Sequence, residues 1–496
     1  MSDSFFSQVL KGTFWVTLFR WVSVGLGTLS TVILARLLLP DDFGLVATAA
    51  IVTGFFEVFS RLGTEQYLIH KQKLTDEEIN TAWTIQLISK LIIAILIFLS
   101  SYYVPVIFNE PRLGNIIKVL AIIPMFMAFN NVGLILLKKE MKFKQLMLFQ
   151  GVIKILVFAV TVIIAFILKS YWAFIVGNVL NYLLTALGSY YVSNYRPKLC
   201  LTKISSQFSF SIWTLLKGIV NYVNSRMDQL LVTKYLNVSL LGELTLGKKI
   251  SSLPGGLVLG PLMDVLFPGL AKSLDNSQEF ASRVQKLLFI IVFITLPLTS
   301  VIILLAEPIV SLFLGDTVKW VGVVEILPLL APILITSALA GKLFDTFTLL
   351  GKVKFLFVYE LITAAVSIGA LFWVFNIYES LSSLIWTKVF IGFCNAAVLL
   401  FFLRKLVDIR LSNLAANILP ILILNVIFTA YVFNIIQQQY LILLPDILHI
   451  LIFGVVYSFF YALSIFILCL VLKKYSREYQ YLWDIIILIK TKYTDN

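Results

Sequence analysis

The chain has 496 residues, of which 60% are hydrophobic and only 13% are charged, and its mean hydropathy is +0.96. Water-soluble domains carry about 25% charged residues, so this composition excludes a water-soluble fold. The 39 Lys and Arg residues exceed the 26 Asp and Glu residues and give a net charge of +13, whose cause must be sought in how the charges are distributed.

Apolar runs of bilayer length, separated by charged or Pro/Gly-containing breaks, recur along the whole chain. Because these runs are continuously apolar and do not alternate, they favour helices over the strands of a membrane barrel. We therefore predict an all-α membrane protein with about fourteen transmembrane helices. The expected spans are 13–35, 43–62, 80–102, 116–137, 147–168, 172–193, 211–233, 241–266, 287–306, 321–349, 355–375, 383–403, 414–435 and 447–472.

Cysteine and histidine are too sparse and too scattered for a disulfide framework or a metal site. The three cysteines are Cys200, Cys394 and Cys469, and the two histidines are His70 and His449. We expect neither a bound metal nor an organic cofactor. The N-terminus has no basic stretch before its first apolar run and no small-residue cleavage site, so we expect that run to be retained.

Positive charges gather in every second connection between the expected spans. The even-numbered connections include the Lys138–Lys144 segment and the Arg404-Lys405 pair, whereas the odd-numbered ones hold only isolated cations such as Arg36 and Arg112. The positive-inside rule then predicts a multi-pass protein of the cell membrane with both termini in the cytoplasm. This distribution accounts for most of the net charge, so no nucleic-acid partner is expected.

An internal repeat follows from shifting the sequence by 198 residues, which superposes Trp15 on Trp213 and Gly44 on Gly242. The alternative is chance agreement among apolar helices. A repeat of six spans predicts two lobes related by a pseudo-two-fold axis along the bilayer normal. The expected domains are a six-helix lobe over 1–200, a second over 201–405, two additional transmembrane helices over 406–472, and a basic cytoplasmic tail over 473–496.

Two short motifs carry a family resemblance. Leu39–Ala47 follows the pattern L-P-x-D-F-G-x-x-A, and Gly63–Ile69 follows G-x-x-x-x-L-I. Together with an Asp in the middle of span 7, these motifs resemble the Wzx-type flippases of the multidrug, oligosaccharidyl-lipid and polysaccharide exporter superfamily, especially the colanic-acid and teichuronic-acid exporters. The resemblance identifies the family better than the substrate.

The resemblance implies a function in the export of surface polysaccharides such as O-antigen and other lipopolysaccharide glycans. A flippase of this kind moves a polyprenyl-diphosphate-linked oligosaccharide across the membrane by alternating access between two lobes. Membrane lipids surround it, and the glycosyltransferases and the polymerase of the same pathway are its expected partners.

Ionisable residues inside the spans are functional candidates, because a charge at mid-membrane costs several kcal/mol unless it faces protein or water. Arg20 lies on a polar stripe of span 1, and a guanidinium suits a diphosphate because it donates bidentate hydrogen bonds. Resemblance to the family also places cations in span 1. The alternative is that Arg20 snorkels to the cytoplasmic interface.

Span 7 carries a continuous polar line at spacings of four, three and four residues: Lys217, Asn221, Asn224 and Asp228. Amides and carboxylates are hydrogen-bond partners for sugars, so we assign Asn221, Asn224 and Asp228 to sugar and Lys217 to diphosphate. Arg226, Lys248 and Lys249 are further diphosphate candidates. The alternative for the line is a buried network that holds span 7 to its neighbours.

Coupling to H⁺ or Na⁺ would require a membrane-embedded carboxylate. The candidates are Asp228, Glu57 and Glu360, although Glu57 is also spaced to pair with Arg61. Two other functions compete with a flippase. A drug/cation antiporter of the same superfamily would favour a cavity rich in carboxylates, whereas deep cations outnumber deep acids here. A membrane glycosyltransferase or polymerase would need a catalytic carboxylate on a large loop or a D-x-D motif, which the sequence lacks. We therefore expect a transporter and not an enzyme.

Overall fold

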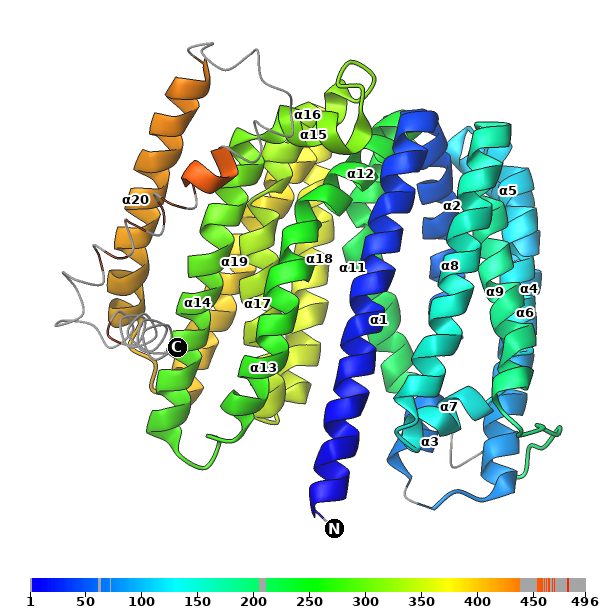
Figure 1. Ribbon diagram of the computed structural model, residues 1–496. Coiled ribbons are helices and arrows are strands. Elements are labelled where there is room, and N and C mark those ends of the chain that lie inside the picture. The colour runs from blue at the N-terminus through cyan, green and yellow to red at the C-terminus, as the bar shows by residue number, and fades with distance from the viewer. Residues whose placement is uncertain are drawn as a thin grey trace, which may run out of the picture. The chain divides into compact units, whose positions relative to one another are not determined.

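The computed structural model describes residues 2–60, 64–71, 73–204, 211–437 and 453–457, and six single positions beyond them. The side chains of some residues inside helices, among them Lys217, lie outside this description. The chain divides into two compact units, unit 1 (Met1–Thr245) and unit 2 (Leu246–Asn496). Every regular element in the described ranges is helical (Figure 1), which confirms the expected all-α class.

Unit 1 contains two short helices near one end of the bundle and a series of longer ones. The helices, in chain order, are α1 (Ser2–Leu37), α2 (Pro40–Val58), α3 (Thr64–His70), α4 (Asp76–Phe108), α5 (Arg112–Leu120), α6 (Ile122–Ala128), α7 (Gly133–Lys139), α8 (Phe143–Leu168), α9 (Trp172–Val192), α11 (Ser211–Tyr235) and α12 (Val238–Pro254), the last of which crosses into unit 2.

Unit 2 continues from α12 through a short π-helical segment. Its elements are η1 (Gly255–Leu259), α13 (Gly260–Ala271), α14 (Ser277–Leu304), α15 (Ala306–Leu314), α16 (Val321–Leu330), α17 (Ile333–Leu349), α18 (Val353–Tyr378), α19 (Leu381–Leu406) and α20 (Leu411–Gln437). The predicted span 447–472 and the basic tail 473–496 lie largely outside the described residues.

Nine helices of the described part are long and apolar enough to cross a membrane, and two bent helix pairs raise this number to eleven if each pair is one span. This agrees with a multi-pass membrane protein. α2 and α11 lie where spans 2 and 7 are expected but fall outside this set. α2 carries three acidic residues and α11 carries four charged residues along its length.

The structure bends two spans that the sequence analysis predicts as continuous. The pair α5–α6 meets α7 at 60°, and α16 meets α17 at 42° across Ala331 and Pro332. A proline removes a backbone donor and clashes with the preceding turn, which explains the second bend. Conversely, Pro254 and the glycines after it do not break span 8, because η1 widens the helix there and α13 continues it.

The helix ends follow local sequence signals. Pro40 occupies the first turn of α2, where its missing N–H costs nothing, and the Asp42 carboxylate accepts a hydrogen bond from Leu39 N (3.0 Å). Thr75 and Glu78 form a capping box at the start of α4, with Thr75 N donating to Glu78 Oε2 (3.1 Å). These signals are readable in the sequence, and they fix where the spans begin.

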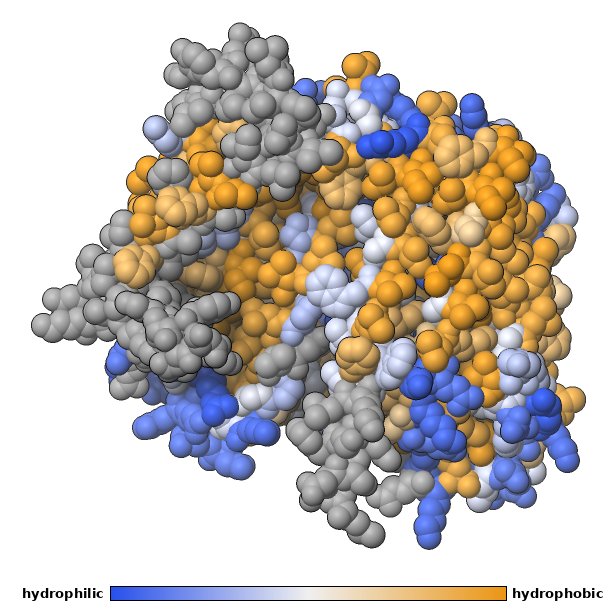
Figure 2. Space-filling view, in the orientation of Figure 1, coloured by the Kyte–Doolittle hydropathy of each residue, from blue (hydrophilic) through white to orange (hydrophobic). Residues whose placement is uncertain are grey.

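Each unit has its own apolar core. In unit 1 a cluster that includes Leu45, Ile97 and Ile116 packs α2 and α4 against α5. In unit 2 Val284, Phe347 and Leu403 pack α14, α17 and α19 together. Many other large apolar side chains stay exposed on the helix flanks, as expected where lipid replaces water. Figure 2 shows hydrophobic residues over the flanks of α8 and α9 and hydrophilic ones near α3 and α7.

Local geometry recurs between the early and the late part of the chain. α1 ends at Leu37 and α2 begins at Pro40; α11 ends and α12 begins 198 residues later, at Tyr235 and Val238. The connection before α8 recurs 210 residues later before α18. Lys142 N donates to Leu137 O (2.9 Å) and Lys352 N to Phe347 O (3.0 Å), around the positive-φ residues Met141 and Gly351. These recurrences support an internal duplication.

Candidate functional site

The polar line predicted on span 7 lies on one unbroken helix. α11 runs from Ser211 to Tyr235, so the four predicted positions share one helical face. Asn221 is exposed, Asn224 is half-buried, and Asp228 is buried with an exposed fraction of 3%. The helix therefore carries its polar groups from an exposed position to one deep inside the protein.

Further polar residues continue this line toward the end of α11. Gln229 and Thr233 are buried, and Arg226, which is exposed, donates from Nη1 to Gln229 Oε1 at 2.8 Å. Burying amide and carboxylate groups is costly unless they are hydrogen-bonded, so a run of them in an apolar bundle marks either a polar network or a wet surface. Arg226 thus has a partner on its own helix, which the sequence analysis does not anticipate.

The other predicted cations lie on α1 and α12. Arg20 is exposed on α1, Lys248 is half-buried and Lys249 is exposed. The two lysines therefore differ in burial, as expected for adjacent positions that point about 100° apart on a helix. The coupling candidates Glu57 on α2 and Glu360 on α18 are both half-buried, and Arg61, the expected partner of Glu57, lies outside the described residues. No contact that brings these predicted residues together is part of the description above.

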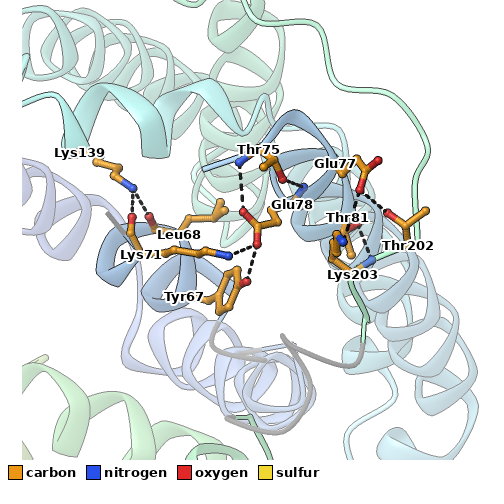
Figure 3. A network of polar contacts seen from close by, with 10 residues as sticks. All are labelled: Tyr67, Leu68, Lys71, Thr75, Glu77, Glu78, Thr81, Lys139, Thr202 and Lys203. Carbon is orange, nitrogen blue, oxygen red and sulfur yellow. Dashed lines mark hydrogen bonds and ion pairs between the residues drawn. The ribbon is translucent and has the colours of Figure 1, made fainter. Parts of the chain in front are cut away.

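No metal site emerges from the described part of the chain, where no group of three His, Cys, Asp or Glu residues comes together. The most closely connected polar groups instead surround the start of α4 (Figure 3). Glu78 is buried at 4% exposure and accepts hydrogen bonds from Lys71 Nζ, from Tyr67 Oη (3.0 Å) and from the backbone of Thr75. The hydrogen bond to Glu78 raises the pKa of Lys71.

A neighbouring set of contacts holds the segment after α9 against α4. Asn80 Oδ1 accepts from Tyr195 Oη (3.0 Å) and from Lys198 N (2.8 Å), and Thr84 Oγ1 accepts from Cys200 N (3.0 Å). This segment leads into the second half of the chain. The α4 end is therefore a structural junction, and the sequence analysis misses it, although the T-x-x-E pattern of Thr75 and Glu78 is a readable signal.

The L-P-x-D-F-G motif has a comparable role at the opposite end of α2. Asp41 pairs with Arg112 (2.7 Å), and Asp42 Oδ1 accepts from Tyr171 N (3.2 Å). Arg112 also binds Glu110 (2.8 Å), and this contact lowers the pKa of the Glu110 carboxyl. The motif thus ties together the connections that precede α2, α5 and α9. Arg112, an isolated cation in an odd-numbered connection, is explained by these two partners.

Comparison with solved structures defines the class of protein. The lipid II flippase MurJ in an inward closed conformation superposes with a TM-score of 0.74 at 14% identity, covering 92% of this chain and 98% of that one. An inward-facing multidrug resistance MATE transporter of the MOP superfamily gives a TM-score of 0.60 at 15% identity, covering 80% of this chain and 95% of that one. The fold is that of the exporters and flippases of this superfamily.

Sequence comparison then gives the family. The model of the family described as polysaccharide biosynthesis protein matches residues 33–325, more than half of the chain, and the chain belongs to this family. An uncharacterized membrane protein in the cps region of Klebsiella pneumoniae is 26% identical over 65% of this chain and 67% of its own length. The lipopolysaccharide biosynthesis protein WzxC of Escherichia coli is 24% identical over 65% of this chain and 66% of its own.

A third relative is named for transport. The succinoglycan biosynthesis transport protein ExoT of Rhizobium meliloti is 22% identical over 65% of this chain and 65% of its own length. The matched region thus spans about two thirds of each relative. These matches agree with the family that the sequence motifs resemble.

Proposed function

We propose that the chain is a flippase that moves a polyprenyl-diphosphate-linked oligosaccharide across the cell membrane for surface polysaccharide biosynthesis. It acts as a transporter and not as an enzyme. The observation that carries this proposal is the polar line of α11, which ends at the buried Asp228 inside an otherwise apolar bundle. A sugar-bearing, anionic lipid needs such polar groups at membrane depth, and family membership supports this substrate class.

The proposed architecture has two six-helix lobes, 1–200 and 201–405, related by a pseudo-two-fold axis, with 406–472 as two additional spans, fourteen in all. The recurrence of helix ends at 198 and of turn geometry at 210 residues supports the duplication. Both termini would lie in the cytoplasm, and substrate would pass between the lobes by alternating access. The polymerase and glycosyltransferases of the pathway are the proposed partners.

In the proposed binding mode Arg20 and Lys217 hold the diphosphate, and Asn221, Asn224 and Asp228 meet the first sugars. Arg226, Lys248 and Lys249 are secondary diphosphate candidates. An Arg–phosphate hydrogen bond in a partly desolvated site contributes about 1.5–3 kcal/mol. Asp228, Glu57 and Glu360 remain candidates for coupling to H⁺ or Na⁺.

The experiment measures surface glycan, membrane-bound lipid-linked oligosaccharide and protein abundance in cells whose own copy of the gene is deleted. Arg20→Ala should lower export about tenfold or more at normal abundance, because one charge-assisted contact is lost. Arg20→Lys should restore part of it, since a lysine lacks the bidentate fork. Asp228→Asn, which keeps shape and removes charge, should also reduce export.

Lys272→Ala is the matched control, because it removes an exposed positive charge from the connection after α13, away from the proposed site. Its export should equal that of the parent. Normal export by Arg20→Ala at normal abundance would move the headgroup site elsewhere, to Lys248 or Lys249 with Arg226. An antiporter would instead change the drug susceptibility of the same strain and leave the glycan unaffected.

A further inference from the structure

The first turns of α2 and α12 touch backbone to backbone, and a glycine stands on each side of the contact. A Cβ atom at Gly44 would lie 1.7 Å from the carbonyl oxygen of Val238, and one at Gly242 would lie 2.0 Å from the carbonyl oxygen of Pro40. Real Cβ atoms essentially never approach within 3.0 Å. Because both obstacles are backbone atoms, no change of side-chain rotamer relieves them.

The contact is reciprocal under the internal repeat. Gly44 and Gly242 are 198 residues apart, and so are Pro40 and Val238, the first residues of α2 and α12. Gly44 meets Val238 while Gly242 meets Pro40, so each half of the contact is the image of the other. Such self-complementary pairing is what a two-fold axis imposes on an interface. All four residues belong to unit 1.

The two sides of the contact are attached to different parts of the chain. The start of α2 is tied to the first half of the molecule through the ion pair of Asp41 with Arg112 and the hydrogen bond of Asp42 with Tyr171. α12 instead continues through η1 into unit 2. Glycines let backbones approach closely and leave no interlocking side chains, so two helix ends joined in this way can separate and re-form.

We propose that the Gly44–Gly242 contact is the outer closure of the transport path, formed while the path is shut toward the outside and released in each cycle. The inference rests on the proposed function, which makes the two halves move against each other, and on the positive-inside orientation, which puts the start of both helices on the outer face. Closely packed contacts are bistable, so a single methyl group at this point shifts the balance toward the open state.

The first experiment uses thiol accessibility. The three native cysteines are replaced by Ser, and Thr48→Cys, a buried position one turn along α2 from Gly44, serves as reporter. Intact cells are treated with a membrane-impermeant maleimide. Gly44→Ala and Gly242→Ala should each raise labelling several-fold and lower glycan export about tenfold at normal abundance, because overpacking prevents closure.

Two further variants sharpen this test. Gly369→Ala makes the same substitution inside α18, where nothing lies within 4 Å, and should change neither labelling nor export. Val238→Ala should not rescue Gly44→Ala, since the obstacle is the carbonyl oxygen and not the valine side chain. Rescue by Val238→Ala, normal export by Gly44→Ala, or lost export without increased labelling would each overturn the proposal.

A second experiment adds no bulk at the contact and so does not depend on the alanine variants folding. Leu39→Cys and Asn237→Cys, exposed positions that directly precede the two helices, are joined by a cleavable bifunctional maleimide. Export should stop on cross-linking and return on cleavage, whereas either single cysteine variant should be unaffected. Continued export with the ends tied would show that the contact need not open.

The labelling readout does not involve the glycan, so it separates this inference from the proposed function. Increased labelling of Gly44→Ala in a protein that moves a different substrate would retain the closure and reject the flippase. Export that depends on Arg20, together with unchanged labelling of both alanine variants, would retain the flippase and reject the closure.

Discussion

At the scale of single residues, the two most deeply buried carboxylates of unit 1 have different surroundings. Glu78 has its partners in the same network and caps α4, so its burial is compensated by hydrogen bonds (Figure 3). Asp228 lies at the end of a polar line on a helix that the proposal assigns to substrate. Burial alone does not distinguish a structural carboxylate from a functional one, whereas the neighbouring groups do.

The Glu78 network predicts a loss of stability without a change in substrate binding. Glu78→Ala removes the capping partner of α4 and the acceptor of Lys71 and Tyr67, which should cost about 1–3 kcal/mol. Thermal unfolding of the purified protein in detergent measures this. Glu77→Ala is the matched control, because Glu77 is 59% exposed and its pair with Lys203 spans 3.8 Å. Equal melting temperatures for Glu78→Ala and Glu77→Ala would contradict the structural role of Glu78.

At the scale of elements, α2 and α11 are packed through small residues and one tyrosine. Tyr222 donates from Oη to the Ile51 carbonyl oxygen (2.6 Å), and a Cβ atom at Gly54 would lie 2.6 Å from the same hydroxyl. Gly218 faces Val58 across the same pair of helices, at 3.2 Å from its Cγ1. The two helices thus approach closely because their facing positions carry little bulk.

This packing predicts a rescue. Gly54→Ala should reduce folded protein, because its methyl group overlaps the Tyr222 hydroxyl, and the combination with Tyr222→Phe should recover most of the loss. Recovery is expected to be incomplete, since the hydrogen bond to Ile51 contributes about 1 kcal/mol. Fluorescence-detected size exclusion of the four variants measures it. A double variant no better than Gly54→Ala alone would mean that the hydroxyl is not the obstacle.

At the scale of the whole molecule, orientation in the membrane can be tested with a native cysteine. Cys200 lies in the segment after α9, which the charge distribution assigns to the cytoplasm, and it is partly accessible. With Cys394 and Cys469 replaced by Ser, an impermeant maleimide should label Cys200 in inside-out vesicles and not in intact cells. The opposite result would reverse the orientation and place Lys138–Lys144 outside.

The same reaction has a predicted pH dependence. Hydrogen bonds with Thr202 lower the pKa of the Cys200 thiol, and the thiolate is the species that reacts. Labelling should therefore rise with pH and level off at a lower pH than for an unperturbed thiol. Thr202→Val removes the hydroxyl partner and should shift the profile to higher pH. An unchanged profile would show that Thr202 does not stabilise the thiolate.

The sequence by itself determined the class of fold and much of its local detail. Continuous apolar runs require helices in a membrane, because a spanning segment must satisfy its own backbone hydrogen bonds. The helix starts at Pro40 and Thr75 follow from residues within one turn, and the regular spacing of Asn221, Asn224 and Asp228 places them on one face of α11. These features depend on neighbours in the chain, so the sequence contains their cause.

Only the tertiary structure decided which residues meet. The bend between α6 and α7, the pairing of Asp41 with Arg112, and the acceptance by Asn80 of hydrogen bonds from the segment after α9 all join residues distant in sequence. The alignment of Gly44 with Gly242 is visible in the sequence, but their contact is not. A glycine is neutral in a hydropathy pattern, and only the approach of another backbone shows why no side chain fits there.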